Sequence, residues 1–231
     1  MGIDDRLLTV AGLVPKNAKV ADIGTDHAYL PIYLRSNNIA SKVIACDISP
    51  GPLAVAEKNI VKSGICGVTT RLCNGLDGVD SSEVDTVVIA GMGGEMITQI
   101  IARADWLRSD TYSLILQPMS SAVELRQFLC DNGFAVETEC AVFSNRRIYS
   151  VMKVFYSGEV LQADPVFLYL GKLLDNITEQ ALIYIKRQKK LISQRVKMLE
   201  TVKRKRAEYL TLCEVLNEID KILLRNDGSC R

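Results

Sequence analysis

Two aspartates stand where buried parallel strands are expected to end, and an acid at such a position can bind a nucleoside. Asp22 lies in the run Val20-Ala-Asp-Ile-Gly-Thr-Asp-His-Ala-Tyr-Leu-Pro31, which indicates a strand, a tight turn at Gly24 and the start of a helix. Asp47 ends the next predicted strand, where a carboxylate can accept hydrogen bonds from both ribose hydroxyls of a cofactor. NAD and S-adenosylmethionine share that requirement, so Asp47 indicates an adenosine cofactor without naming it.

The turn after the first strand helps to separate these two cofactors. It holds only Gly24, whereas a pyrophosphate favours a glycine-rich start of the helix. A sulfonium amino acid carries positive charge instead, which the carboxylates of Asp22 and Asp26 could balance. The turn therefore favours S-adenosylmethionine, and an ordinary strand-to-helix turn is the alternative.

Three further turns follow predicted strands and complete a candidate pocket. In Leu72-Cys-Asn-Gly-Leu76, Asn74 could pair with the amine of an adenine ring, although Asn-Gly is also simply a good turn. The run Ile89-Ala-Gly-Met-Gly-Gly-Glu95 leaves the backbone open where cofactor and substrate should meet. In Leu114-Ile-Leu-Gln-Pro-Met-Ser120, Gln117 and Pro118 could form a second wall of the substrate pocket.

Short apolar runs alternate with helical stretches through the first 157 or so residues. Buried strands are expected at Lys19–Asp22, Val43–Asp47, Val68–Leu72, Asp85–Ala90 and Ser113–Gln117. Helices are expected between them at Tyr29–Asn37, Pro52–Ser63, Glu95–Ala104 and Ala122–Asn132. This alternation predicts a parallel sheet with helices on both faces.

The next two strands, Phe134–Phe143 and Arg147–Tyr156, are separated by too few residues for a crossover, so they should form an antiparallel hairpin. Five parallel strands followed by such a hairpin are typical of a class I methyltransferase sheet with the order 3-2-1-4-5-7-6. The fold class predicted is thus α/β and Rossmann-like, with a seven-stranded, mostly parallel sheet. The domains predicted are 1–158 for cofactor binding, 159–226 for a helical, coiled-coil-like domain, and 227–231 as a tail.

The helical part begins with a short helix near 165–174. Apolar residues then recur at helical spacing, which predicts two long helices that form an antiparallel pair with a turn near Thr201–Lys205. One uninterrupted helix is the alternative. Between Lys186 and Arg206 there are ten basic residues and one acid, Glu200. Such a strip could neutralise RNA phosphates, although a charge run can also be merely the solvated face of a coiled coil.

Composition limits the other function classes. The chain has 231 residues, is 48% hydrophobic and carries a formal net charge of +1, so it can bury a core and is not strongly basic overall. His27 is the only histidine, which nearly excludes a histidine-based zinc site, and no metal is expected. Seven cysteines without a C-x-x-C pair, and no apolar run long enough for a membrane span, predict a cytoplasmic protein with reduced, mostly buried thiols.

Four motifs in this order and spacing resemble the bacterial tRNA (adenine-22-N1)-methyltransferase family: Arg6-Leu-Leu8, the ADIGTDHAYLP run, Ile89–Gly94 and Leu114–Pro118. The resemblance covers about residues 3–156 by motif, and the helical tail fits the family's C-terminal domain. It implies a Rossmann-like fold, S-adenosylmethionine and a tRNA substrate methylated on N1 of adenine 22. A monomer or weak homodimer is expected.

The site residues expected fall into three groups. The catalytic candidates are Asp26, His27 and Tyr29, with Asp26 as the carboxylate that stabilises positive charge on the product. The cofactor candidates are Asp22, Gly24, Asp26, His27, Asp47, Ile48, Asn74, Gly75, Ala90, Gly91, Met92 and Gly93. The substrate candidates are Arg6, Gly94, Gln117, Pro118, Lys203, Arg204, Lys205 and Arg206, and Arg146 and Arg147 are weaker phosphate contacts.

Two positions depart from the family's usual pattern. Asn74 stands where members often have Asp, and it keeps an acceptor oxygen. Met119 stands where members often have Asn, which removes a polar group from the expected substrate side. Three other functions stay open from the residues alone: a methyltransferase for a small molecule or protein, a non-catalytic RNA-binding protein on the same fold, and a nicotinamide oxidoreductase.

Overall fold

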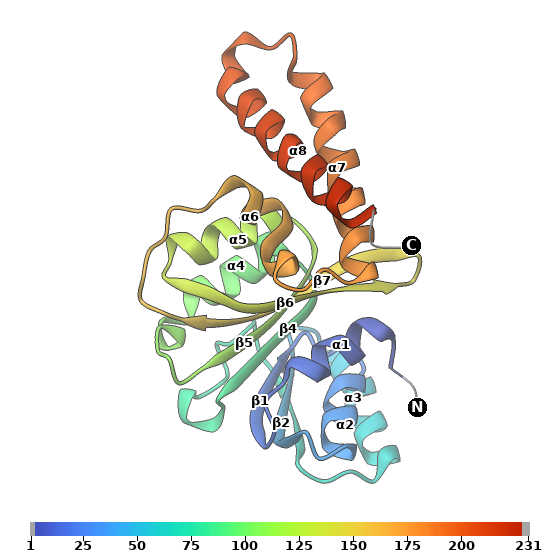
Figure 1. Cartoon of the computed structure of the whole chain (residues 1–231). Helices are drawn as coiled ribbons and strands as arrows, with labels where there is room; N and C mark the ends of the chain where they lie inside the picture. Colours follow the sequence, from blue (N-terminus) through green and yellow to red (C-terminus); the bar gives the residue numbers. More distant parts are fainter. Residues whose placement is uncertain (1–2, 228–231) are drawn as a thin grey trace.

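The computed structural model of the chain describes residues 3–227, which form a layered α/β domain with a helical arm (Figure 1). Seven strands make one sheet: β1 (Ala18–Ile23), β2 (Ala40–Asp47), β3 (Val68–Leu72), β4 (Thr86–Gly93), β5 (Ser113–Ser120), β6 (Phe134–Ser144) and β7 (Arg147–Tyr156). Their order is β3-β2-β1-β4-β5-β7-β6, as predicted. β1 to β5 are parallel, and β7 pairs antiparallel with both β5 and β6.

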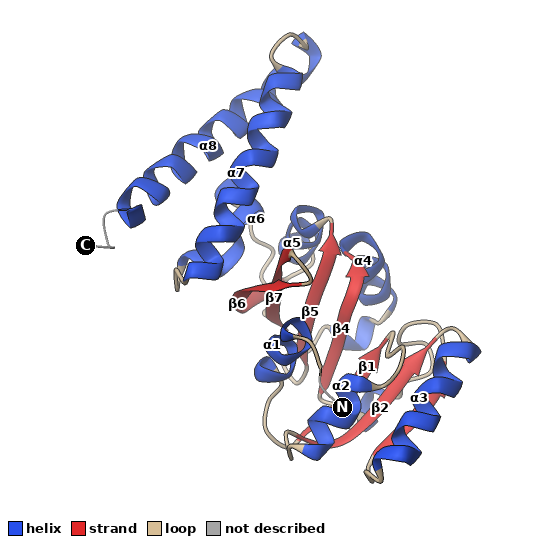
Figure 2. Ribbon diagram, turned by 90° about the vertical axis from the view of Figure 1, so that its right-hand side faces the viewer, coloured by secondary structure: helices blue, strands red, loops and turns tan. Residues whose placement is uncertain are grey.

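Helices cover both faces of this sheet. They are α1 (Asp5–Leu13), α2 (Tyr29–Ser36), α3 (Pro50–Ser63), α4 (Gly94–Arg103) and α5 (Ala122–Asp131), with short 3-10 turns at Ser81–Glu83 and Asp105–Leu107. Figures 1 and 2 place α1, α2 and α3 on one face and α4 and α5 on the other.

Alternate residues along the strands divide the core between the two faces, because successive side chains of a strand point in opposite directions. Ala21 of β1 and Ile89 of β4 belong to the cluster under α4 and α5. Val20 and Val88, one position before each, belong to the cluster under α1 and α2. The sheet therefore holds the ends of β1, β2, β4 and β5 rigidly at one edge.

Three details of the sequence prediction are wrong. Val68–Leu72 is a strand but not a buried one, because β3 lies at the edge of the sheet and its residues are partly or fully exposed. The helix α1 was not predicted. The cysteines are not mostly buried: among those described, Cys46 and Cys130 are buried, while Cys66 is exposed and the others are intermediate.

The helical arm is an antiparallel pair, as predicted, and the alternative of one long helix is wrong (Figure 2). After α6 (Pro165–Leu170) and a 3-10 turn at Gly171–Leu174, α7 (Glu179–Leu199) runs outward and α8 (Arg206–Asp227) returns, joined through a 3-10 turn at Lys203–Lys205. The pair has its own core, which includes Ile185, Ile192, Val215 and Ile219. Most of the tail predicted at 227–231 lies outside the described residues.

A buried ion pair joins the arm to the sheet. Arg126 of α5 and Glu139 of β6 are both fully buried, and Nη2 of Arg126 lies 2.6 Å from Oε1 of Glu139. The same guanidinium donates to the carbonyl of Leu168 in α6 and to the hydroxyl of Tyr184 in α7. Oε2 of Glu139 accepts the backbone N–H of Lys172. We call these residues the Arg126 hub.

Candidate functional site

A cavity of about 460 Å³ opens at the carboxyl ends of β1 and β4. It is lined by Ile3, Asp4, Arg6, Leu7, Asp22, Gly24, Thr25, Asp26, Tyr29, Leu30, Ala90 and Gly91. The cavity lies where ligands of open α/β sheets bind, at the point where the strand order reverses between β1 and β4. We call it the β1–β4 pocket.

Asp22 is the buried acid of this pocket, with only 5% of its surface exposed. Burial raises the pKa of Asp22 to about 6, the nearby Thr25 lowers it and the charge of Asp47 adds to the rise. A buried carboxyl with a pKa so close to neutrality would be stabilised in its charged form by a cation.

Asp47 faces the turn after β1 from the end of β2. Its Oδ2 accepts the backbone N–H of Asp26 at 3.2 Å, and its Oδ1 accepts that of Ser49 at 2.9 Å. These bonds fix the carboxylate next to the turn. Ile48, the following residue, has an exposed side chain.

Gly24 allows the turn after β1 to pass close to the end of β4, which extends to Gly93 beyond the predicted strand end at Ala90. Its φ is +75°, and a Cβ at this position would lie 2.3 Å from the terminal methyl of Met92. Gly94, at the start of α4, is closer still to a neighbour, since its Cβ would meet the backbone oxygen of Ser121 at 2.2 Å. Backbone packing therefore requires the glycine at position 94, whereas the positive φ favours the glycine at position 24.

Asp26, His27 and Tyr29 stand together at the mouth of the pocket. The Asp26 carboxylate is 68% exposed and lies 3.6 Å from Nε2 of His27. The rings of His27 and Tyr29 meet edge to face at 5.6 Å. Asp26 and Ala28 have positive φ and belong to the turn before α2, which begins at Tyr29 as predicted.

Arg6 closes the pocket from α1, the helix that was not predicted from the sequence. Its Nη1 donates to Oε1 of Gln117 at 2.8 Å, and the same oxygen accepts the backbone N–H of Gly91 at 3.0 Å. Gln117 and Pro118 are buried, whereas Met119 is 41% exposed. The buried Gln117 thus connects α1, the β4 loop and the end of β5.

Asn74 is not among the residues that line the β1–β4 pocket. Its side chain is exposed, and its Oδ1 accepts from Nη2 of Arg103 at 3.3 Å. Gly75 beside it is buried, with φ +61°. The placement at the end of β3 agrees with the predicted turn, and the contact of Asn74 with an adenine ring stays a prediction.

The residues at this edge fit a cationic nucleoside cofactor. Asp22 offers a buried acid whose charged form a cation would stabilise, and Asp47 offers a carboxylate held by backbone bonds at the end of β2. Gly24 keeps the turn between them free of a side chain.

Comparisons with known proteins agree with this geometry. A family model described as a methyltransferase domain matches residues 3–152. A tRNA (adenine(22)-N(1))-methyltransferase of Bacillus subtilis is 35% identical over 173 residues, which cover 74% of this chain and 73% of that protein. The chain belongs to this methyltransferase family.

Solved structures of similar proteins extend the match to the helical arm. The Bacillus subtilis tRNA methyltransferase TrmK is 28% identical with a TM-score of 0.82, over 94% of this chain and 98% of that one. A Streptococcus pneumoniae protein, Sp1610, solved in complex with S-adenosyl-L-methionine, is 28% identical with a TM-score of 0.80, over 93% and 100%.

The predicted basic strip is divided by the structure into paired and unpaired charges. Lys189 pairs with Asp220 at 2.6 Å and Arg195 with Glu208 at 2.6 Å, and Lys205 also approaches Glu208, at 3.2 Å. Within residues 3–227, Lys190, Lys197 and Arg204 form no such pair. Arg206 lies over the ring of Tyr209, and the side chain of Lys203 lies outside the description.

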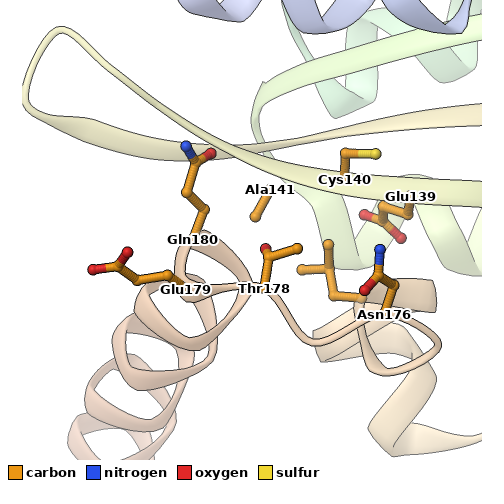
Figure 3. Close-up of a pocket in the computed structure, with 8 residues that line it drawn as sticks. Glu139, Cys140, Ala141, Asn176, Thr178, Glu179 and Gln180 are labelled. Carbon is orange, nitrogen blue, oxygen red and sulfur yellow. The ribbon is translucent and has the colours of Figure 1, made fainter. Parts of the chain in front are cut away.

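A second cavity lies away from the strand ends, at the base of the arm (Figure 3). It is lined by Glu139, Cys140 and Ala141 of β6 and by Leu173, Asn176, Thr178, Glu179 and Gln180.

Arg146 and Arg147, the weaker phosphate candidates, lie at the tip of the β6–β7 hairpin. In the described part of the chain, no cluster of metal-ligating side chains occurs and no helix is long and apolar enough to cross a membrane.

Proposed function

We propose that this chain transfers a methyl group from S-adenosylmethionine to N1 of adenine 22 in tRNA. The observation that carries the proposal is the β1–β4 pocket, in which a buried acid faces a glycine loop beside a cavity open to a substrate. The family and the similarity to a tRNA (adenine(22)-N(1))-methyltransferase supply the substrate and the position.

Methyl transfer to N1 of adenine requires the protein to orient the reactants more than to supply a general base. S-adenosylmethionine supplies a methyl group on a positively charged sulfur, a good leaving group. N1 of neutral adenine has an in-plane lone pair and no proton to lose. Alignment of the two reactants is worth roughly 7–11 kcal/mol in well-oriented reactions.

Different residues at this site would bind the cofactor, stabilise the product and contact the target base. Asp22, Gly24, Ala90 and Gly91 of the pocket lining would hold the cofactor. Asp47 at the end of β2 and Met92 and Gly93 at the end of β4 would contribute, with Gly75 at the adenine end. Asp26, at the mouth of the pocket, would stabilise the positive charge that the methylated adenine acquires. The rings of His27 and Tyr29 would pack against the target base.

The opposite wall would position the substrate. Arg6 is fixed by Gln117, and that contact holds α1 over the pocket. Gln117, Pro118 and Gly94 would form the wall against which the adenine is held. The adenine must leave its stack in the folded tRNA to reach this wall, which costs a few kcal/mol.

The arm would bind the body of the tRNA through its basic residues, with Arg204, Lys205 and Arg206 at the turn between α7 and α8. This proposal retains the division into a catalytic part, 1–158, and a tRNA-binding part, 159–226. It also retains a monomer or weak homodimer, and a cytoplasmic location because tRNA is the substrate.

The decisive experiment is methylation of an in vitro-transcribed tRNA with labelled S-adenosylmethionine, followed by mapping of the modified base. We expect a single N1-methyladenine at position 22 and no product from a transcript with guanine there. An Asp26→Ala variant should methylate tRNA more slowly, and unchanged methylation by the cofactor-bound variant would contradict the role given to Asp26. Methylation of proteins or small molecules instead of tRNA would contradict the proposal, as would failure to bind S-adenosylmethionine in calorimetry.

A further inference from the structure

A groove at the junction of the catalytic domain and the arm adjoins the site described so far and shares Pro118 with its substrate wall. Its walls are the turn from β5 into α5, the strand β7 and one side of α7. The lining residues are Pro118, Met119, Ser120, Ser121, Ala122, Val123, Glu124, Ile148, Tyr149, Ser150, Tyr184, Arg187, Gln188 and Leu191, around a cavity of about 180 Å³. We call it the junction groove.

Gln117 forms hydrogen bonds both with residues at one end of the junction groove and with residues of the β1–β4 pocket. The side-chain nitrogen of Gln117 donates to the carbonyl of Pro118 and lies 3.6 Å from the sulfur of Met119. The side-chain oxygen of the same Gln117 accepts from Arg6 and Gly91 in the pocket. A single buried side chain therefore contacts lining residues of both cavities.

The other end of the junction groove reaches the basic arm. Arg187 donates one Nη to the carbonyl of Ile148, so its guanidinium is held at the groove wall and keeps further donors for a ligand. Lys190, without an ion pair in residues 3–227, lies one helical turn further along α7. The groove therefore leads from the pocket toward positive charge.

The chemistry of the walls suits a nucleotide chain. Met119 and Leu191 leave 41% and 46% of their surfaces exposed, which gives apolar contacts for a base. Ser120, Ser121 and Gln188 offer hydroxyl and amide groups for sugars and phosphates. The lining holds one acid, Glu124, and one cation, Arg187.

The floor of the junction groove is rigid. Ser150 and Tyr184 line it and also accept hydrogen bonds from the buried Arg126. Because Arg126 is paired with Glu139 and bonded to α6, the spacing between β7 and α7 is set by the Arg126 hub.

We infer that the junction groove binds the tRNA strand next to the target adenine and guides it from the basic arm into the β1–β4 pocket. The inference rests on the proposed function and adds a strand-binding surface to it. Gln188, Arg187 and Leu191 on one wall and Met119, Ser120 and Ser121 on the other make the contacts.

Placing a negative charge in the groove tests the inference. Leu191→Glu, with an unchanged thermal unfolding curve, should raise KM for tRNA about tenfold, the effect of one lost favourable contact with a polyanion. The dissociation constant for S-adenosylmethionine, measured by calorimetry, should stay at the wild-type value. The matched control is Val61→Glu, an equally charged change at an exposed apolar residue of α3 outside both the groove and the arm, which should change KM by less than about twofold.

A footprint gives an independent readout. In a Ser120→Cys variant, the new thiol should be protected from maleimide by saturating tRNA but not by S-adenosylmethionine. The exposed Cys66, far from the groove, should react at the same rate with and without tRNA.

The outcomes separate the two proposals. A wild-type chain that does not methylate tRNA overturns the proposed function and the groove with it. A wild-type chain that methylates tRNA, with wild-type KM in Leu191→Glu and no protection of the thiol at position 120, overturns the groove alone. A change of oligomeric state in Leu191→Glu would show that a second copy occupies the groove and would also overturn it.

Discussion

Asp22 is the residue whose chemistry depends most on its surroundings. The carboxyl is buried at the end of a strand, and burial raises the pKa of Asp22 to about 6. A neutral carboxyl suits an empty apolar site, whereas a carboxylate suits a bound cation. The charge of Asp22 should therefore change when the cofactor binds.

The first prediction concerns pH. S-adenosylmethionine, as a cation, should bind the ionised Asp22, so its affinity should rise as pH increases through about 6 and level off above it. For a pKa near 6, the rise between pH 5 and pH 7 is about tenfold. Calorimetry across this range measures it, and Asp22→Asn should bind more weakly with a flat profile.

The contribution of the Asp22 carboxyl to the free energy of unfolding changes with pH in the opposite direction to its effect on cofactor affinity. The free acid loses its proton near 3.8 and the folded one near 6, so the folded state holds more protons between these values. Raising the pH through this interval should lower the free energy of unfolding by about 3 kcal/mol in total. Urea unfolding of the wild type and of Asp22→Asn should diverge accordingly, and parallel curves would contradict the raised pKa.

Among elements, the strands and the C-terminal helices were predicted from the sequence, whereas the N-terminal helix was not. Val20, Val43 and Val88 lie in short apolar runs, and such runs are typical of buried strands. The exposure of β3 could not be predicted, since its place at the edge depends on strand order.

α1 was missed although its sequence carried a signal. Asp4 is a good N-cap, and Leu7, Val10, Ala11 and Val14 follow at helical spacing. The contact of Arg6 with Gln117, 111 residues away in the sequence, could not be predicted in the same way, because it depends on the position of α1 over the sheet.

The second prediction tests the cap of α1. The Oδ1 of Asp4 accepts the backbone N–H of Leu7 at 2.8 Å, so Asp4→Ala should cost about 1 kcal/mol of stability. It should also weaken tRNA methylation, because Arg6 lies 3.7 Å from the same carboxylate and closes the pocket. Asp5→Ala removes the same charge without a cap and should have a smaller effect on both the unfolding midpoint and the rate.

On the scale of the whole molecule, the Arg126 hub joins two parts that the sequence presents as separate. Arg126 and Glu139 looked like ordinary surface charges in the sequence, since nothing local marks their burial. The third prediction is that Glu139→Gln costs about 3–5 kcal/mol in urea unfolding, because it leaves the buried guanidinium without its counter-charge.

Two further variants show whether burial is the cause. Glu137→Gln breaks the exposed pair with Lys153, 2.8 Å apart, and should cost less than about 1 kcal/mol. Replacing both hub partners by apolar residues, Arg126→Met with Glu139→Leu, should cost less than Glu139→Gln alone. Equal losses in Glu137→Gln and Glu139→Gln would contradict the role given to burial.

The fourth prediction concerns the basic arm. The structure shows which of its lysines form ion pairs, whereas the sequence gives only their number. Lys189 is already neutralised by Asp220, whereas Lys190 and Lys197 have no ion pair within residues 3–227. Each phosphate contact contributes a slope of about 0.7–0.9 to the fall of log affinity with log salt concentration. Lys190→Gln with Lys197→Gln should therefore lower the slope for tRNA by about 1.5, and Lys189→Gln should lower it much less. Filter binding at several salt concentrations measures both, and equal slopes for the two variants would mean that the ion pair with α8 opens when tRNA binds.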